Sequence, residues 1–165
     1  MVIVNTGSTA RVTNDNKAKP FFLKLVWIGI RAIVYHPERF RSDAISRDIL
    51  VNDEASSPQL VTRLVTYRTP EGERNSTEVC KMYPQCHAEI EKEDGMTIGY
   101  YVTRGDTEED LYLTCTIQQP VPGVNSGSKE EQALVDKYRE LTKTWLGEDI
   151  EHMRELYDFL LQYTR

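Results

Sequence analysis

The chain has 165 residues, of which 39% are hydrophobic and 28% charged, and its 26 Asp and Glu against 20 Lys and Arg give a formal net charge of −6. This length suits one globular domain, residues 1–165, that can bury a sizeable core. No two Lys or Arg residues are adjacent, whereas nucleic-acid-binding proteins normally carry a basic stripe, so nucleic acid is not an expected partner.

The N-terminal part of the chain predicts a strand followed by helices. Apolar residues alternate with polar ones between Val2 and Val12, which is typical of a strand. Bulky residues in Phe21–Tyr35 recur at helical spacing, and Pro37 ends that pattern. We therefore expect a helix of about four turns and a short helical turn at residues 37–40.

From Asp43 onward the hydrophobic period changes to two. Six segments show strand-like alternation, and each is bounded by Gly, Pro, Asn or Asp. Their spacing predicts an antiparallel meander made of Ala44–Val51, Leu60–Thr69, Ser76–Tyr83, Cys86–Glu91, Thr97–Thr103 and Leu111–Gln119.

The C-terminal segment predicts one long helix. Ser128 and Glu131 are spaced as a capping box, and apolar residues then recur at helical spacing to the end, with a kink or break allowed at Gly147. The layout is α+β, and the long helix is the only element large enough to cover one face of the sheet. Because a helix and a curved sheet touch along a line, we expect an internal cavity between them.

No membrane span, signal peptide or metal site is expected. The longest hydrophobic run, Leu25–Val34, is interrupted by Arg31 and is far shorter than the roughly 20 residues of a transmembrane helix. Residues 1–13 lack the basic start and apolar middle of a signal peptide. Three cysteines at spacings that match no zinc pattern predict free thiols and a cytoplasmic location; they are Cys80, Cys86 and Cys115.

An ordered set of short motifs resembles the helix-grip, START-like SRPBCC superfamily, and within it the AtaL-like group of fungal secondary-metabolite clusters. In the N-terminal part these motifs are Ser8-Thr9-Ala10-Arg11-Val12, Val26-Trp27 and His36-Pro37-Glu38-Arg39-Phe40. Further along they are Val61-Thr62-Arg63, Val65-Thr66-Tyr67, Thr77-Glu78-Val79, Met82-Tyr83-Pro84, Tyr101-Val102-Thr103, Asp110-Leu111-Tyr112-Leu113-Thr114, Pro122-Gly123 and Lys137-Tyr138-Arg139. The sequence departs from the pattern at Gln85, where a second Pro is common, and at Arg41-Ser42, where a Phe or Val-Pro commonly follows the helix turn.

The resemblance implies a curved seven-stranded antiparallel sheet wrapped around the long C-terminal helix, with one or two short helices after the first strand. Known members of the superfamily bind apolar small molecules or catalyse cyclisations. We therefore expect an apolar small molecule as the partner of this chain, which would be a monomer or a homodimer.

Arg63 and Glu78 form the first candidate catalytic site. The hairpin turn at residues 70–72 returns the chain antiparallel, so Glu78 is expected opposite or diagonal to Arg63 on one face of the sheet. On the cavity side, the pair would orient a carbonyl or enolate by bidentate hydrogen bonds. On the convex side, it would be an ordinary solvated salt bridge. The sequence leaves both alternatives open.

Tyr100 is the third candidate catalytic residue. By strand alternation Ile98, Tyr100 and Val102 face inward, whereas Tyr112 faces outward. A tyrosine suits a mixed pocket because its ring supplies apolar contact while its hydroxyl donates to a developing oxyanion.

The three histidines are weaker candidates. His87 is expected on the outer face of its strand, His36 precedes a proline at a helix end where a capping role is favoured, and His152 lies on the charged side of the last helix. No catalytic triad, phosphate-binding loop or metal-ligand cluster can be defended, so we expect no cofactor.

The remaining candidates are ligand-binding residues on the inward faces of strands and on the apolar stripes of the helices. The two tryptophans are more often core residues, but the inner stripe of the last helix also covers the cavity. Together with Tyr100, the predicted lining consists of Trp27, Val65, Tyr67, Val102, Leu113, Cys115, Leu141 and Trp145.

Two functions fit these expectations. The first is a cofactor-free cyclase or isomerase of secondary metabolism, which folds a polyketide- or terpenoid-like intermediate for cyclisation, pericyclic closure included. Such an enzyme needs no nucleophile, because constraint near the reactive geometry alone lowers the barrier by several kcal/mol. The alternative is a non-catalytic carrier for an apolar metabolite, which has little reason to bury Arg63 and Glu78.

Overall fold

The order of strands and helices follows the sequence prediction from end to end. A computed structural model of the protein describes residues 1–12, 23–107 and 110–163. Its elements are β1 (Val2–Arg11), α1 (Leu23–Tyr35), α2 (Pro37–Phe40), β2 (Ala44–Asp53), β3 (Gln59–Thr69), β4 (Gly72–Tyr83), β5 (His87–Lys92), β6 (Thr97–Arg104), β7 (Leu111–Val121) and α3 (Lys129–Tyr163). The predicted start of the first helix, Phe21, lies outside the described residues.

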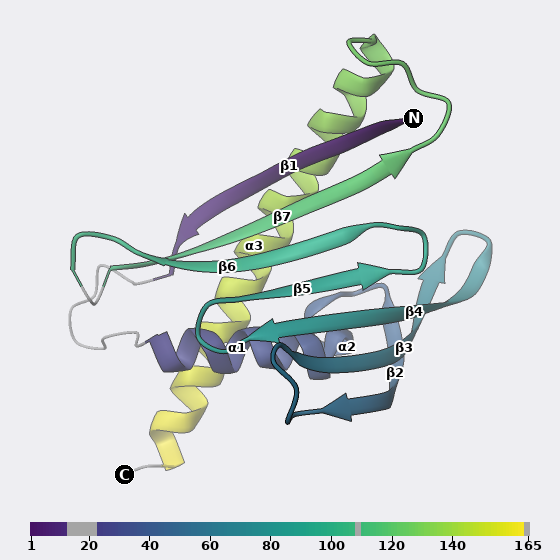
Figure 1. The fold of residues 1–165 in the computed structure, drawn as a ribbon. Helices are drawn as coiled ribbons and strands as arrows, with labels where there is room; N and C mark the ends of the chain where they lie inside the picture. Colours follow the sequence, from purple (N-terminus) through teal and green to yellow (C-terminus); the bar gives the residue numbers. More distant parts are fainter. Residues whose placement is uncertain (13–22, 108–109, 164–165) are drawn as a thin grey trace.

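The seven strands form one antiparallel sheet. Their order is β1-β7-β6-β5-β4-β3-β2, so neighbouring strands from β2 to β7 follow one another in sequence, whereas β1 pairs with β7 (Figure 1). The register of β2 shifts between Ala44 and Ser46 and again between Ile49 and Val51, and such irregularities bend a strand. The expected curved sheet with a long C-terminal helix is confirmed.

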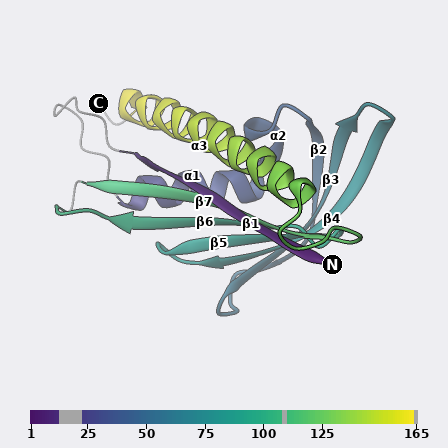
Figure 2. The ribbon, with the colours of Figure 1, turned by 90° about the horizontal axis from the view of Figure 1, so that it is seen from above.

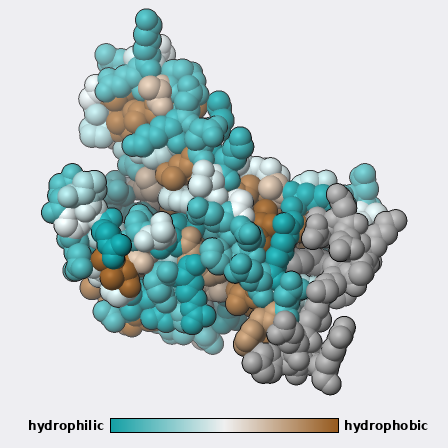
Figure 3. Space-filling model, turned by 180° about the vertical axis from the view of Figure 1, so that it is seen from behind, coloured by the Kyte–Doolittle hydropathy of each residue, from teal (hydrophilic) through white to brown (hydrophobic). Residues whose placement is uncertain are grey.

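All three helices lie on one face of the sheet, and α3 crosses that face diagonally (Figures 1 and 2). Alternate residues of β7, from Leu111 to Ile117, are fully buried on the helix side, as the period of two predicts. Leu146, Ile150 and Met153 of α3 pack into the same core. From the helix side the surface is mostly hydrophilic, with hydrophobic residues in separate patches (Figure 3).

The long helix α3 begins with the predicted cap. The Ser128 hydroxyl accepts a hydrogen bond from the Glu131 N–H at 3.1 Å, and the Glu131 carboxylate accepts one from the Gly127 N–H at 2.6 Å. The helix then runs for 35 residues without a break at Gly147. None of the described helices is both long and apolar enough to cross a membrane.

The crossing of α1 and α3 depends on a glycine. A Cβ added at Gly29 would lie 2.4 Å from Cγ of Met153, far closer than two carbon atoms can pack. Val26, Ile30 and Ile33 beside this crossing are buried. Gly29 therefore sets how closely α1 approaches α3.

Two glycine substitutions test this helix crossing. Gly29→Ala should lower the free energy of unfolding by about 1–3 kcal/mol, because overpacking against the buried Met153 outweighs the gain in helix propensity. Gly147→Ala is the matched control: no atom lies within 4 Å of its added Cβ, so it should raise stability by about 0.5–1 kcal/mol. Urea unfolding measures both, and equal stabilisation by the two variants would contradict the tight crossing.

Candidate functional site

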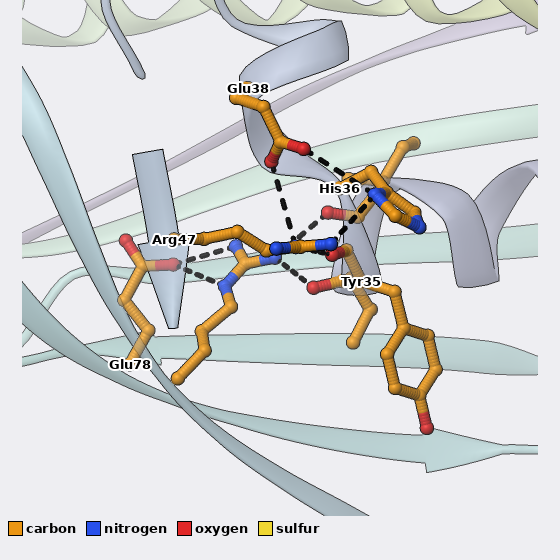
Figure 4. A network of polar contacts seen from close by, with 8 residues as sticks. Tyr35, His36, Glu38, Arg47 and Glu78 are labelled. Carbon is orange, nitrogen blue, oxygen red and sulfur yellow. Dashed lines mark hydrogen bonds and ion pairs between the residues drawn. The ribbon is translucent and has the colours of Figure 1, made fainter. Parts of the chain in front are cut away.

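The C-terminal end of α1 is buried against the sheet, and arginines from two strands satisfy its carbonyl groups. The last carbonyls of a helix have no partner within the helix. Arg63 Nη1 on β3 donates to the Ile33 carbonyl at 2.8 Å and also to the Val34 carbonyl, while Arg47 Nε on β2 donates to the Tyr35 carbonyl. In Figure 4 the Arg47 guanidinium lies between Tyr35, His36 and Glu38. Two strands therefore hold the end of this helix.

Arg63 is also paired with Glu78, as the hairpin register predicts. The two residues are direct partners in the β3–β4 ladder, and Arg63 Nε and Nη2 donate to Glu78 Oε2 at 2.8 and 2.6 Å. Arg63 is 2% exposed and Glu78 is 0% exposed. The pair is on the concave side, but most of the Arg63 donors already bind Glu78 and the helix end. The sequence suggested a catalytic or a solvated pair and missed this capping role.

The second oxygen of Glu78 is satisfied as well. It accepts a hydrogen bond from the Tyr67 hydroxyl at 2.6 Å, and Lys92 Nζ lies 3.3 Å away. Burial alone would raise the pKa of Glu78, but the positive charges of Arg63 and Lys92 hold it below its ordinary value. The same burial, together with the Glu78 charge, raises the pKa of Tyr67, so this hydroxyl stays protonated.

A second buried ionic cluster lies on the other side of the same region. Arg41, just after α2, donates through Nη1 to Asp149 Oδ1 at 2.7 Å and through Nη2 to Asp149 Oδ2 at 2.9 Å. Arg41 Nη2 also donates to the Tyr100 hydroxyl, which in turn donates to Asp149 Oδ2 at 3.0 Å. The Arg41 guanidinium lies 4.6 Å from the ring centroid of Trp145.

Electrostatics keep this second cluster in fixed protonation states. Burial raises the pKa of Tyr100 well above its ordinary value, so the hydroxyl remains a donor. Burial alone would lower the pKa of Arg41. Tyr100 and Asp149 beside the guanidinium outweigh this effect, so the pKa of Arg41 lies above its ordinary value. Burial also raises the pKa of the neighbouring Cys115 thiol to about 12, which rules out a thiolate nucleophile at neutral pH.

Both clusters face one small cavity, which opens to solvent beside the exposed Asp43. Its volume is about 30 Å³, which accommodates about two water-sized groups. Tyr67, Tyr100 and Trp145 of the predicted lining reach this cavity, together with Ile33, Pro37, Arg41, Asp43, Arg63, Ile90, Lys92 and Ile98. The structure thus brings two candidate catalytic residues, Arg63 and Tyr100, to one space.

The other six predicted lining residues are not on the wall of this cavity. Val65, Leu113 and Cys115 are fully buried, Trp27 belongs to the core cluster, and Val102 and Leu141 pack against that cluster. Alternation correctly placed the strand residues on the helix side, but α3 packs so closely that most of them contact other side chains rather than open space.

Arg41 and Asp149 were not identified from the sequence. Arg41 was noted only as a departure from the family pattern, although it is 9% exposed. Asp149 is 0% exposed and lies at helical spacing between Leu146 and Met153 on the buried stripe of α3. An acidic residue on an apolar stripe was the signal that would have revealed it.

The histidines lie away from the cavity. His87 faces outward as predicted and stacks between the rings of Tyr83 and Tyr101, with centroids 4.0 and 5.2 Å away. His36 occupies the N-cap position of α2, but its side chain makes no cap hydrogen bond there. The described residues contain no group of three His, Cys, Asp or Glu arranged to hold a metal ion. The three cysteines are free, as predicted.

Removing the Arg63 side chain should destabilise the fold more than removing the whole ion pair. Arg63→Met leaves Glu78 buried without its main partner and should cost about 3–5 kcal/mol. The double variant Arg63→Met/Glu78→Leu removes the stranded charge but leaves two helix carbonyls unpaired, so its stability should fall between that of the single variant and that of the wild type. Urea unfolding of the wild type, the single variant and the double variant measures this order of stability.

The exposed pair Lys81 and Glu91 supplies the control for this series. Its side chains are 32% and 44% exposed, so Lys81→Met should change stability by less than about 1 kcal/mol. If the double variant Arg63→Met/Glu78→Leu were as stable as the wild type, capping of α1 by Arg63 would contribute nothing to the stability of the fold.

The lowered pKa of Glu78 predicts a pH dependence with a definite sign. The unfolded chain takes up a proton at this carboxyl near the ordinary value of 4.5, whereas the folded chain stays ionised to lower pH. The ionised Glu78 therefore contributes fully to the stability of the fold above its ordinary pKa. This contribution is lost as the pH falls below the ordinary pKa and through the lower pKa of the folded state. The stability difference between the wild type and Arg63→Met/Glu78→Leu should shrink over that range, and a constant difference would contradict the shift.

Comparison with solved structures places the chain among helix-grip proteins. The di-domain ARO/CYC StfQ from the steffimycin biosynthetic pathway matches with a TM-score of 0.64 at 12% identity, over 92% of this chain and 50% of StfQ, so the chain spans about half of that protein. Zhui aromatase/cyclase from Streptomyces sp. R1128 matches with a TM-score of 0.64 at 10% identity, over 93% of this chain and 94% of Zhui. At such identities the likeness establishes the fold.

The same fold occurs in Ara h 8.0201, with a TM-score of 0.57 at 8% identity over 93% of this chain and 99% of that one. A search of curated proteins gave no match. The family model for acetylaranotin biosynthesis cluster protein L (AtaL) matches residues 8–158, nearly the whole sequence. The resemblance seen in the motifs is thereby confirmed, and the chain belongs to the AtaL family.

Proposed function

We propose that this protein is a cofactor-free cyclase or isomerase of secondary metabolism that acts on an apolar, polyketide- or terpenoid-like intermediate. Its membership of a biosynthesis-cluster family and its structural likeness to two aromatase/cyclases support this proposal. The observation that carries it is the group of ionisable residues around one small cavity. Arg63 and Glu78 serve the end of α1, but Arg41, Tyr100 and Asp149 are also buried, which is costly and which a binding protein for an apolar molecule does not need.

The charges around the cavity favour a developing anion. Arg41, Arg63 and Lys92 contribute three positive charges, and the buried carboxylates of Glu78 and Asp149 contribute two negative ones. The remaining carboxylate, Asp43, is exposed at the rim, where water screens it. Preorganised donors in a water-poor space stabilise an oxyanion more in the transition state than in the ground state.

An intramolecular aldol-type closure fits this arrangement. The enol form of the substrate attacks a carbonyl carbon through its own carbon, and a C–C bond forms as the carbonyl π bond breaks. The attacked carbonyl oxygen gains negative charge and takes a proton from Tyr100, while the enol oxygen becomes a carbonyl and releases its proton, which returns to Tyr100. In our proposal Lys92 donates a hydrogen bond to the attacked oxygen, the charge of Arg41 stabilises it, and the protonated Tyr100 hydroxyl supplies the proton, with Asp149 orienting both Arg41 and Tyr100. The product is an isomer of the substrate, or differs from it by one water if dehydration follows.

The cavity accommodates the reacting carbonyl rather than a whole intermediate. Trp145 is half-buried and lies over the Arg41 guanidinium, so its ring covers the cavity. In our proposal the intermediate displaces this ring, which costs the cation–π contact of about 0.5–2 kcal/mol. The body of the substrate then contacts apolar residues that the sequence predicted as lining, Leu141 and Val102 among them.

The test uses a metabolite extract from a strain in which this gene is deleted. Wild-type protein should convert an accumulated precursor, over many turnovers, into a product of equal mass, or of mass reduced by one water, with altered retention. Tyr100→Phe keeps the ring and the bidentate Arg41–Asp149 pair but lacks the hydroxyl, so it should lose about 10²–10³ in turnover. Chromatography coupled to mass spectrometry measures both.

Tyr101→Phe is the matched control on the same strand. Tyr101 faces the opposite side of the sheet, beside His87, so this variant should turn over like the wild type. Stoichiometric co-purification of an unchanged metabolite, without product, would establish the carrier function instead. Full turnover by folded Tyr100→Phe would remove Tyr100 from the mechanism.

A further inference from the structure

A second, larger hollow lies on the opposite side of the α1–α2 corner from the small cavity. Its volume is about 360 Å³, within the range of small-molecule pockets. Its walls come from α1, α2 and the C-terminal half of α3, and we call it the three-helix groove. It is lined by Ala32, His36, Arg39, Phe40, His152, Glu155, Leu156 and Phe159.

The three-helix groove and the small cavity have no lining residue in common. Along the corner, Ile33, Pro37 and Arg41 face the cavity, whereas Ala32, His36 and Phe40 face the groove. This four-residue spacing places the two sets on different sides of the same short segment. The groove is therefore a separate site, and the inference drawn from it does not depend on the cyclase proposal.

His36 offers a hydrogen-bond donor to the groove. Arg47 Nη2 lies 3.0 Å from His36 Nδ1. Glu38 Oε1, which can only accept, lies farther from the same nitrogen, at 3.4 Å. Because an arginine can only donate, the shorter contact makes Nδ1 the acceptor, and in the neutral ring the proton is on Nε2. Figure 4 shows the ring of His36 held at this end by Arg47 and Glu38, with its other nitrogen directed away from them. Within the part of the chain that the structure describes, that nitrogen has no partner.

His152 offers the complementary acceptor. Its Nδ1 lies 2.8 Å from the Glu148 carbonyl one turn earlier. Because a carbonyl can only accept, Nδ1 carries the proton, and Nε2 of the neutral ring has a free lone pair. The ring packs against Phe40 with centroids 5.4 Å apart, which fixes its place in the wall. No described residue donates to this Nε2.

The rest of the groove favours a neutral, apolar ligand. Phe40, Leu156 and Phe159 supply aromatic and aliphatic walls. Arg39 and Glu155 are exposed at the rim and carry opposite charges, so the groove has no net charge that would select an ion. A planar aromatic body fits these walls, and a hydroxyl group on such a ring can both accept and donate a hydrogen bond through a single atom.

We propose that the three-helix groove binds neutral aromatic alcohols of the phenol class. The ligand ring packs against Phe40 and Leu156, and its hydroxyl accepts from His36 Nε2–H and donates to His152 Nε2. Each histidine is held in the required tautomer by its contact on the other nitrogen, to Arg47 or to the Glu148 carbonyl. This fixed tautomer pair distinguishes a phenol from an ether or a hydrocarbon of the same shape.

The probes are 2-naphthol, 2-methoxynaphthalene and naphthalene, titrated into the full chain and followed by calorimetry. 2-Naphthol can both accept and donate, its methyl ether can only accept, and naphthalene can do neither. We expect 2-naphthol to bind about tenfold more tightly than the ether, the value of one hydrogen bond of about 1.4 kcal/mol. Equal affinity for 2-naphthol and naphthalene, or no binding of any probe, would overturn the proposal.

The variant His152→Phe assigns the site. It keeps an aromatic ring beside Phe40 but removes the acceptor, so 2-naphthol should bind it only as well as the ether does, while the affinity of the ether is unchanged. His87→Phe, on the outer face of the sheet, is the matched control and should bind all three probes like the wild type. Unchanged 2-naphthol affinity in folded His152→Phe, or a loss in Tyr100→Phe instead, would place the ligand elsewhere and refute the assignment.

Discussion

The buried C-terminus of α1 is the constraint on which the interior of this protein depends. A helix that ends against a sheet exposes carbonyl groups to a region without water, and each unpaired group costs about 1–3 kcal/mol. Arg63 and Arg47 bring their donors from the sheet to these carbonyls, and positive charge at this end also complements the helix dipole. Once a guanidinium is buried for this reason, a buried carboxylate must accompany it, which accounts for Glu78.

The two buried arginines around the cavity are both largely engaged by the protein itself. Most donors of Arg63 bind the helix end and Glu78, and both Nη groups of Arg41 bind Asp149, the Phe40 carbonyl and the Tyr100 hydroxyl. The Lys92 ammonium, which lies 4.1 Å from the Tyr67 ring centroid, ends a flexible stem. The groups best suited to contact a substrate are accordingly Tyr100 and Lys92, with Arg41 acting through its charge, and only Tyr100 of these was a candidate from the sequence.

Patterns in the sequence predicted those features of the site that depend on residues close to one another in the chain. Alternation and turn position fixed which side of its strand Tyr100 occupies and placed Glu78 opposite Arg63, because the tight turn sets the hairpin register. The partnership of Arg41 with Asp149 joins residues 108 positions apart, and no periodicity encodes it. The volume of the cavity depends on how closely α3 packs on the sheet, a distance set in part by Gly29 against Met153, and residue alternation carries no information about that distance.

The pairing of β1 with β7 has a consequence for how the protein is made. Arg11 pairs with Tyr112 and Val2 with Val121, and the Ser8 hydroxyl lies 3.0 Å from that of Thr142 on α3, so both partners of β1 are translated long after it. Contacts this distant in sequence form slowly. On the ribosome β1 must wait without its partners while the hairpins β2 to β6 can already assemble. Until β1 arrives, the outer edge of β7 is open to pairing with another nascent chain. The sheet is thus completed only when its first-made strand pairs with its last-made one, and that pairing covers the edge of β7.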